Sequence, residues 1–287
     1  MDAAVVQLAE RGVVKQVRGM PTSDGAGVKL TRVIGQPALQ DLDPFLMLDE
    51  FGTDNPGDYI AGFPAHPHRG FETVTYMLDG RMRHKDNHGH EGVLVPGAVQ
   101  WMTAGRGIVH SEMPEQQEGR MRGFQLWLNL PAAAKMMPPA YQEFGPERIP
   151  SVRPVPGVQV KVIAGTVGAV IGPVIQPATD PTYLDIELQA DTSFVHALPQ
   201  GHSAFVYVFE GELLVGTGRT AVRLPQHTLA VLGEGAQVSL QTATTAARAI
   251  LVAGRPLREP VARYGPFVMN TQEQVRQAYA DYQSGRF

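Results

Sequence analysis

The sequence predicts an all-β protein built from two β-barrels, and three observations support this prediction. Glycine (31) and proline (23) are plentiful among the 287 residues and lie throughout the chain, which is typical of many turns between short elements. The segments between these turns are rich in β-branched and aromatic residues that often alternate with polar ones. A strand with its turn also recurs about 131 residues later in the chain. We therefore expect two copies of one β-fold.

The expected strands are short apolar or alternating segments bounded by glycine or proline. They cover residues 74–78, 92–96, 158–165, 182–189, 204–216, 228–235 and 249–254. Two segments instead favour helices. Residues 131–139 form a short alanine-containing stretch between prolines, and residues 270–283 begin with polar capping residues and have Glu and Gln in the first turn.

The internal repeat sets the expected domain boundaries. VTYMLDG (74–80) resembles FVYVFEG (205–211), because each is a strand that ends in an acidic residue and a turn glycine. The intervening segment is rich in proline and polar residues, as a connector should be. We expect an N-terminal domain at 1–135, a linker at 136–157 and a C-terminal domain at 158–287 that carries the final helix.

Composition excludes several classes of function. The net charge of −4 gives no general field for nucleic acid, so we expect no direct nucleic-acid binding. The sequence has no run of about 18 apolar residues, so no membrane-spanning helix is predicted. The first residues lack the pattern of a signal peptide, and the two observations together favour a cytoplasmic protein. Cysteine is absent. Any metal must therefore be held by nitrogen and oxygen ligands.

The first candidate ligands lie in the stretch HPHRGFE, at His66 and His68. In an extended strand, residues two apart lie on the same face, so both imidazoles would point to one side. Pro67 between them indicates the start or the edge of a strand, because proline cannot donate to the ladder. An isolated pair of this kind also fits two polar loop histidines without a ligand role.

A second stretch, WMTAGRGIVHSEMPE, carries His110 and Glu112 with the same spacing. Its glycines allow a tight turn just before the histidine. Three imidazoles and one carboxylate suit a divalent first-row metal and leave coordination positions open. Glu72 competes with Glu112 for the carboxylate position. We rank Glu112 first, because Gly70 makes the register between His68 and Glu72 unsafe.

These two stretches resemble the pirin family of the cupin superfamily, as do LDPFLMLDEFG (42–52) and FQLWLNLP (124–131). The similarity is strong over residues 28–131 and looser elsewhere. It implies two cupin, jelly-roll-like barrels that face each other in one chain, with metal only in the N-terminal barrel. It also implies the ligands His66, His68, His110 and Glu112, whereas the general cupin pattern uses the glutamate after the histidine pair, here Glu72.

The resemblance also implies a chemistry. Pirins are similar in site to quercetin dioxygenases, so we expect a dioxygenase that opens the ring of a flavonol such as quercetin with O2 and releases carbon monoxide. The expected cofactor is one divalent first-row ion; the family favours iron, and nickel, copper, manganese, cobalt and zinc stay open. Glu112 could act as the base that takes the flavonol 3-hydroxyl proton. The partners would be a flavonol-like aromatic substrate and O2, and the barrel pairing within one chain implies a monomer.

Other functions stay open at this point. Some pirins are metal-dependent regulators that bind protein partners, with the oxidation state of the metal as the switch. A cupin isomerase, or a metal-holding relic without turnover, is a third interpretation.

The C-terminal domain is expected to be structural. The repeat offset places Ala197 and Pro199 where His66 and His68 would fall, and the nearby His196 and His202 do not form the same pair. The remaining cluster of histidines, RMRHKDNHGHEGV, is interpreted as a solvated hairpin rather than as a metal site.

Overall fold

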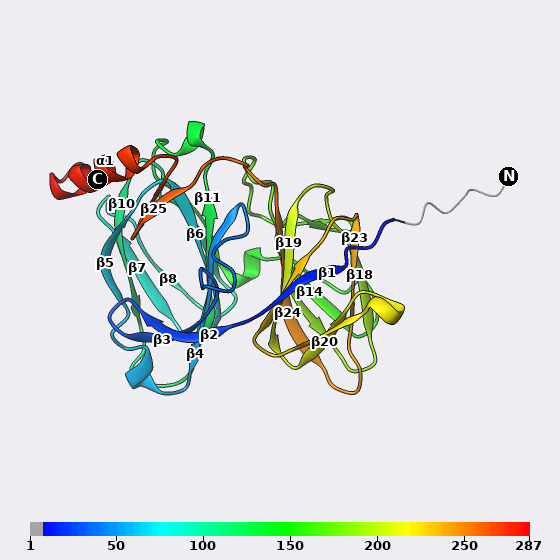
Figure 1. The fold of residues 1–287 in the computed structure, drawn as a ribbon. Helices are drawn as coiled ribbons and strands as arrows, with labels where there is room; N and C mark the ends of the chain where they lie inside the picture. Colours follow the sequence, from blue (N-terminus) through cyan, green and yellow to red (C-terminus); the bar gives the residue numbers. More distant parts are fainter. Residues whose placement is uncertain (1–7) are drawn as a thin grey trace. The chain divides into compact units, whose positions relative to one another are not determined.

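The computed structural model describes residues 8–287 and contains two compact units that exchange their terminal segments. Unit 1 holds residues 8–18, 150–176 and 180–256, and unit 2 holds residues 19–149, 177–179 and 257–287. The first strand, β1 (Val13–Arg18), thus belongs to unit 1, where it pairs with β22 (Thr228–Leu232). The division of the chain differs from the expected boundaries at 135 and 158. Residues 8–18 join the unit formed mainly by the second half of the chain, and residues 257–287 join the unit formed mainly by the first half (Figure 1).

Unit 2 is built from two main antiparallel sheets. The order of the seven-stranded sheet is β12 (Ala140–Phe144), β9 (Val99–Thr103), β6 (Phe71–Asp79), β11 (Met121–Asn129), β4 (Phe45–Thr53), β3 (Val28–Ile34) and β2 (Met20–Asp24). The order of the four-stranded sheet is β5 (Phe63–His68), β10 (Ile108–Pro114), β7 (Met82–Asp86) and β8 (Glu91–Leu94). A separate hairpin is formed by β25 (Ala262–Tyr264) and β26 (Phe267–Met269).

Unit 1 repeats this plan. Its seven-stranded sheet has the order β1, β22, β19 (Ser203–Glu210), β24 (Ala247–Gly254), β17 (Thr182–Leu188), β14 (Val158–Ala164) and β13 (Ser151–Val152). Its four-stranded sheet has the order β18 (Ser193–Ala197), β23 (Gln237–Gln241), β20 (Glu212–Val215) and β21 (Val222–Pro225). A short hairpin joins β15 (Thr166–Val167) to β16 (Val170–Ile171). The two predicted repeat segments lie in β6 and β19, which hold the third place in their respective sheets, so the all-β prediction with an internal repeat is confirmed.

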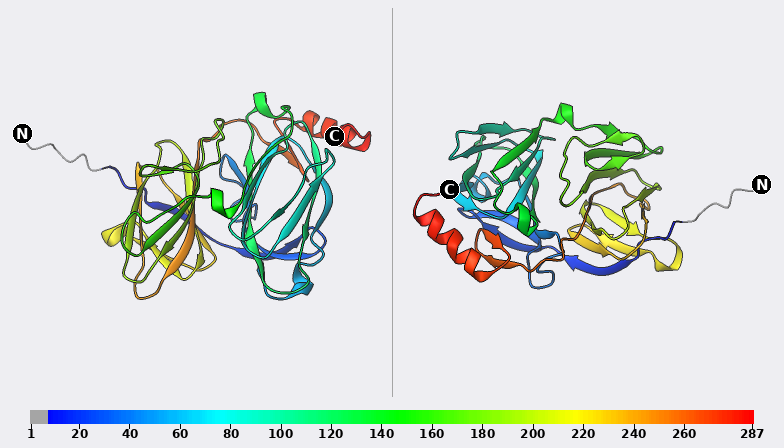
Figure 2. Two further views of the ribbon diagram at one scale, coloured as in Figure 1. Left: turned by 180° about the vertical axis from the view of Figure 1, so that it is seen from behind. Right: turned by 90° about the horizontal axis from the view of Figure 1, so that it is seen from above.

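The two helix predictions have different outcomes. Helix α1 (Gln272–Gln283) is present, and Thr271 caps it while Gln274 completes the capping box, as the polar start predicts. It packs against β25 and β26 of unit 2 (Figure 2). The expected helix at 131–139 is wrong, because only the 3-10 turn η2 (Ala132–Ala134) forms between its prolines. No helix in residues 8–287 is long and apolar enough to cross a membrane.

The proline-rich stretch expected to be a linker is not free of structure. It supplies the edge strand β12 to unit 2 and the edge strand β13 to unit 1, with the 3-10 turn η3 (Pro146–Arg148) between them. Two further 3-10 turns, η1 (Pro56–Asp58) and η4 (Gly218–Thr220), lie in connections between strands.

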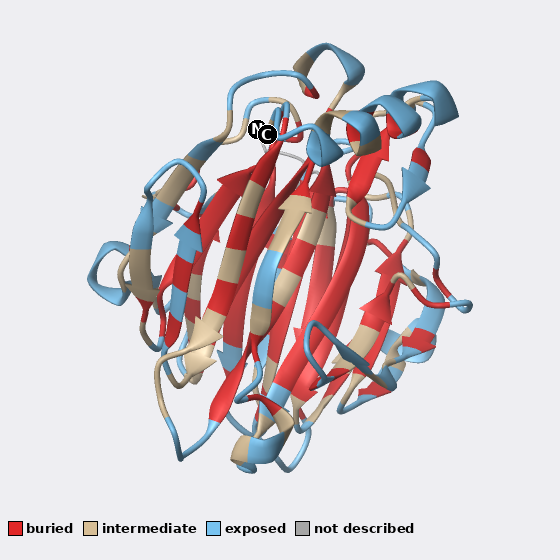
Figure 3. Cartoon of the chain, turned by 90° about the vertical axis from the view of Figure 1, so that its left-hand side faces the viewer, coloured by how far each residue is buried: buried red, intermediate tan, exposed pale blue. Residues whose placement is uncertain are grey.

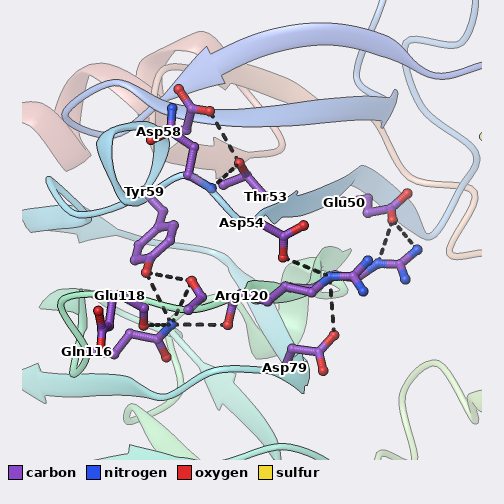
Figure 4. Close-up of polar contacts among 12 residues, drawn as sticks. Glu50, Thr53, Asp54, Asp58, Tyr59, Asp79, Gln116, Glu118 and Arg120 are labelled. Carbon is purple, nitrogen blue, oxygen red and sulfur yellow. Dashed lines mark hydrogen bonds and ion pairs between the residues drawn. The ribbon is translucent and has the colours of Figure 1, made fainter.

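The long strands of unit 2 are buried along most of their length, as Figure 3 shows. In both β4 and β6, seven of the nine residues are buried. At the end where β4 finishes and β11 begins, polar contacts fasten the loops (Figure 4). The Tyr59 hydroxyl donates to the Gly119 carbonyl at 2.8 Å, and the Arg122 guanidinium donates to Glu50 at 2.9 Å within a buried pair.

Unit 1 has a core of aliphatic side chains contributed by both of its sheets, among them Val206, Leu184 and Leu240. Arg11 fastens the first described residues to it, because its guanidinium donates to the carbonyls of Pro199, His202 and Gly235. His196 on β18 is buried beside Phe194, with ring centroids 5.9 Å apart. Burial lowers the pKa of His196 to about 4, so its imidazole is neutral at pH 7.

The buried His196 predicts a loss of stability in mild acid. In the unfolded chain its pKa returns to about 6.5, so the unfolded state binds more protons between pH 6.5 and pH 4. Stability therefore falls as the pH drops through that window. We expect this residue alone to make the free energy of unfolding about 2 kcal/mol lower at pH 5 than at pH 7.5.

The substitution His196→Gln should remove this part of the pH dependence, as measured by denaturant unfolding followed by circular dichroism at both pH values. His88→Gln, at an exposed position, is the matched control. An equal loss of stability at pH 5 in the His196 variant and in the unchanged protein would contradict the assignment.

Candidate metal centre

Three histidines converge because two strands pair in one register. In the antiparallel ladder between β5 and β10, His110 lies opposite His66, and Ile108 lies opposite His68. Since alternate residues of a strand share a face, all three imidazoles point to the same side of the sheet. Each offers a ring nitrogen, and these nitrogens lie within 4.8 Å of one another. The structure thus brings together His66, His68 and His110 as the sequence predicts.

The turns that precede and follow these strands require glycine. Gly70 has φ +87°, and a Cβ there would lie 2.0 Å from the Val268 carbonyl oxygen. Gly105 has φ +52°, and a Cβ there would lie 2.2 Å from the Met137 carbonyl oxygen. The Gly70 amide donates to the Gly105 carbonyl at 2.8 Å, so the two turns are tied to each other. Only glycine combines this backbone conformation with so close an approach.

Lys135 secures the same turn from the inside. Its buried ammonium group donates to the Gly70 carbonyl at 2.7 Å, to the Asn129 side-chain oxygen at 2.6 Å and to the Val268 carbonyl at 2.9 Å. An ammonium has three donors, and each has an acceptor here. Burial lowers the pKa of Lys135 to about 8. The turn after His68 is therefore held by a residue from the stretch that was expected to be helical.

The histidines are prepared to bind a cation as neutral ligands. His68 and His110 are buried, and burial together with the neighbouring imidazoles holds the pKa of each well below the usual range. Within residues 8–287, Nδ1 of His68 and both ring nitrogens of His110 are buried without a hydrogen-bond partner. Such groups are costly to bury, and a metal ion would satisfy them. The residues present therefore fit a metal.

His66 is the most accessible member of the triad. Its Nδ1 lies 2.8 Å from the Pro64 carbonyl oxygen, which orients the ring and leaves Nε2 available to a metal. The His68 ring contacts Phe71 and Trp127 with centroids 5.0 Å and 5.2 Å away, and Trp127 also lines the cavity. The triad is thus packed against aromatic rings and borders the cavity through His66 and His68.

Glu112 lies beside the triad but outside the group of mutually close ligand atoms. The β5–β10 ladder shifts its register between His110 and Glu112, so Glu112 lies opposite Phe63. Its buried carboxyl accepts a hydrogen bond from the Thr75 hydroxyl at 2.9 Å and faces the Gln125 amide at 3.5 Å. Burial raises the pKa of Glu112. Its role as a ligand or base stays a prediction.

Glu72 belongs to a different surface. It lies on β6, which is regularly paired from Glu72 to Tyr76, so its side chain points to the opposite face from that of Thr75. It accepts a hydrogen bond from the Thr103 hydroxyl at 2.6 Å. Glu112 lines the cavity at the triad, and Glu72 is not among the residues that do so.

The cavity next to the triad has a volume of about 560 Å³. His66, His68 and Glu112 lie in its wall. Apolar and aromatic side chains make up much of the rest, including Phe51, Phe63, Met47 and Trp127. A cavity of this size with a few convergent polar groups is typical of small-molecule sites.

A row of polar residues crosses the seven-stranded sheet of unit 2 under this cavity. Register pairs join Arg32 to Asp49, Asp49 to Gln125, Gln125 to Thr75, and Thr75 to Gln100. In unit 1, the strands at the same positions of the seven-stranded sheet carry a row of residues paired in the same order. All of these residues are aliphatic: Val162, Leu184, Leu251, Val206 and Ala230. The same fold thus has a polar interior in one unit and an apolar core in the other. Polar residues at core positions indicate function rather than stability.

Sequence reasoning missed several of these residues. Gln125 and Trp127 lie in the FQLWLNLP stretch, whose strict alternation could have placed them on one face. Arg263 lines the cavity from β25, far along the chain, and no local pattern indicates it. The expectation of a solvated histidine hairpin holds for His88 and is wrong for His84, which is buried on β7 with Nε2 2.8 Å from the Glu143 carboxylate.

Known proteins share both units. The family profile Pirin matches residues 27–128, and the profile Pirin C-terminal cupin domain matches residues 183–287. A protein of Pseudomonas aeruginosa with the provisional name quercetin 2,3-dioxygenase is 53% identical over 279 residues, which are 96% of this chain and 97% of that one.

Solved structures agree in fold. The structure of quercetin 2,3-dioxygenase from Acinetobacter baumannii matches with a TM-score of 0.89 and 33% identity, and the match covers 97% of this chain and 99% of that one. A bacterial pirin from Escherichia coli in complex with nickel(II) matches with a TM-score of 0.65 over 84% of this chain and 98% of that one. At 18% identity, the latter likeness concerns the fold alone.

The triad predicts that one divalent ion binds per chain through His66, His68 and His110. Replacing His110 by Ala removes one of three imidazole ligands, which should lower the affinity for Co(II) or Ni(II) more than about 100-fold, since loss of even an indirect partner costs 10- to 100-fold. Calorimetric titration of the chelator-treated protein measures this. His88→Ala is the control and should bind as the unchanged protein does. Tight stoichiometric binding by the His110 variant would exclude the site.

Proposed function

The chain belongs to the pirin family, and from this premise we propose that it is a metal-dependent dioxygenase that opens the ring of a flavonol such as quercetin with O2 and releases carbon monoxide. The observation that supports this most directly is the convergence of the His66, His68 and His110 imidazoles beside a cavity with aromatic sides, where His66 and His68 lie in the wall. The name of the similar Acinetobacter baumannii structure agrees with this chemistry.

We propose that His66, His68 and His110 hold the metal, with Glu112 as a fourth ligand or a neighbouring base, and that iron is the native ion. Nitrogen and oxygen donors without sulfur accept several first-row ions. When bound, such an ion supplies a position for a chelating substrate and a route for electrons to O2. The depressed pKa values of His68 and His110 keep these ligands neutral at pH 7, which is the form that binds metal.

Glu112 is the proposed general base. A flavonol that enters the cavity with its 3-hydroxyl toward the triad would present that proton next to the Glu112 carboxylate. Because burial raises the pKa of Glu112, its carboxylate is a stronger base than an exposed one. The hydrogen bonds from Thr75 and Gln125 fix the direction of the carboxyl group. In this proposal Glu112 accepts the proton and holds it while the substrate is bound as its anion.

The cavity suits a flat aromatic substrate. Its volume of about 560 Å³ lies within the range of small-molecule sites, and Phe51, Phe63 and Trp127 offer ring surfaces against which a planar molecule can pack.

The proposed activity predicts O2 uptake and carbon monoxide release when quercetin is added to protein loaded with Fe(II), Ni(II), Co(II) or Mn(II). His66→Ala should abolish both signals because one of the three imidazoles is lost. His88→Ala, which removes an exposed histidine of the same unit, should leave both unchanged. An oxygen electrode and a haemoglobin assay for carbon monoxide provide the readouts. Metal-loaded protein that consumes no O2 with quercetin would overturn the dioxygenase proposal and favour a metal-dependent regulator.

Two matched substitutions separate the candidate carboxylates. Glu112→Gln keeps the shape of the side chain but removes the base, so kcat should fall by at least about 100-fold at full metal content. Glu72→Gln changes a side chain on the face of β6 opposite to that of Thr75, the residue that contacts Glu112, and should leave kcat within about threefold. Metal analysis and thermal unfolding of both variants check that each is loaded and folded. The reverse pattern would assign the catalytic role to Glu72.

A further inference from the structure

The wall of the cavity beyond the triad is formed by Trp127 and Arg263. The Trp127 ring centroid is 5.2 Å from that of His68, and the Arg263 guanidinium carbon lies 5.0 Å over the Trp127 ring. Imidazole, indole and guanidinium are therefore in sequential contact, with the guanidinium within about 10 Å of the His68 ring. A two- or three-ring aromatic molecule can span that distance.

Arg263 differs from the other arginine of this cavity in its partners. Arg32 donates to both oxygens of Asp49, at 2.9 Å and 2.7 Å, and to Asp24 at 2.7 Å. Within residues 8–287, Arg263 has no carboxylate at ion-pair distance; its polar contact is with the Leu46 carbonyl at 3.3 Å. A guanidinium has five donors in a planar fork, so most of those of Arg263 are available to a ligand.

Arg263 is exposed to solvent at one side, and the groups around it have opposing effects on its charge. Partial burial and the nearby Arg32 lower the pKa of Arg263, while Asp49 and Asp24 act in the opposite direction. The Trp127 face compensates in part by a cation–π contact. An anion placed in the cavity would accept the unused donors through charge-assisted hydrogen bonds, which are about twice as strong as those between neutral groups.

We propose that Arg263 determines specificity by binding an anionic group on the part of the substrate remote from the metal-chelating end, so that the preferred substrates are planar aromatics with an acidic substituent such as an ionised phenol, a carboxylate or a sulfate. This inference rests on the proposed function, since it assigns the far end of the same site. The near end binds the triad, Trp127 supports the ring system, and the guanidinium pairs with the acidic group.

The test compares charged and uncharged flavonols that are otherwise matched. Quercetin 7-sulfate and 4′-sulfate are each compared with the methyl ether at the same position, because either ring can face Arg263. Binding to metal-loaded protein is measured without O2 by quenching of tryptophan fluorescence. We expect at least one sulfate to bind about tenfold more tightly than its ether, the effect of one charge-assisted hydrogen bond.

Three variants assign the preference to the side chain. Arg263→Gln should weaken the preferred sulfate about tenfold and its ether less than twofold, while Arg263→Lys should retain part of the preference because it keeps the charge but not the fork. Arg276→Gln removes the same charge from an exposed position on α1 and should change neither affinity. A purely structural role for Arg263 would instead lower the affinities for sulfate and ether alike.

The outcomes separate this inference from the proposed activity. If quercetin is turned over but neither sulfate is preferred, or if Arg263→Gln leaves the preference intact, the role of Arg263 is overturned and the dioxygenase function stands. If the sulfate preference depends on Arg263 but no flavonol consumes O2, the anion site stands and the dioxygenase function falls. Absence of binding by every flavonol overturns the role of Arg263 as well.

Discussion

The candidate metal centre depends on the register in which β5 pairs with β10. His110 faces His66 across this ladder and His68 follows two residues later, so one alignment of hydrogen bonds places three imidazoles at one point. A slip of one residue in this pairing would turn the histidine side chains of one strand to the other face of the sheet. Contacts outside the ladder oppose such a slip: Gly70 and Gly105 bind each other through the backbone, and Lys135 holds the Gly70 carbonyl. The chemistry of the site is thus a consequence of backbone alignment.

The two units show how one fold serves two purposes. The row that carries Gln125 and Thr75 in unit 2 carries Leu251 and Val206 at the paired places in unit 1. Aliphatic side chains there fill the interior and stabilise the fold through burial. The polar row forgoes that stabilisation, and each of its members must find hydrogen bonds inside the protein. Unit 2 pairs its polar residues with one another and with Glu112, which turns a core into a lined cavity.

Much of this could be predicted from sequence where the signal is local. Spacing of two residues put His66 with His68 and His110 with Glu112 on common faces, and the capping residues located α1. The triad came together as expected because strands preserve that spacing. Features that depend on distant segments could not be predicted. Arg263 reaches the cavity from β25, and β1 belongs to unit 1. The polar segment around His84 buries one of its three histidines, because alternate residues of β7 point into the protein although the segment is polar on average. Proline limited the expected helix at 131–139 to a single turn.

The exchange of terminal segments has a consequence for the order of events in the cell. Residues 257–287 belong to unit 2, and they supply Arg263 to its cavity and the Val268 carbonyl beside Gly70. The ribosome makes these residues only after all of unit 1. The histidine strands of unit 2 therefore leave the ribosome well before the segment that closes their turn, and the complete centre is assembled after unit 1 has been synthesised. If the site holds a metal as proposed, the complete site would be available to that metal only after residues 257–287 have been synthesised.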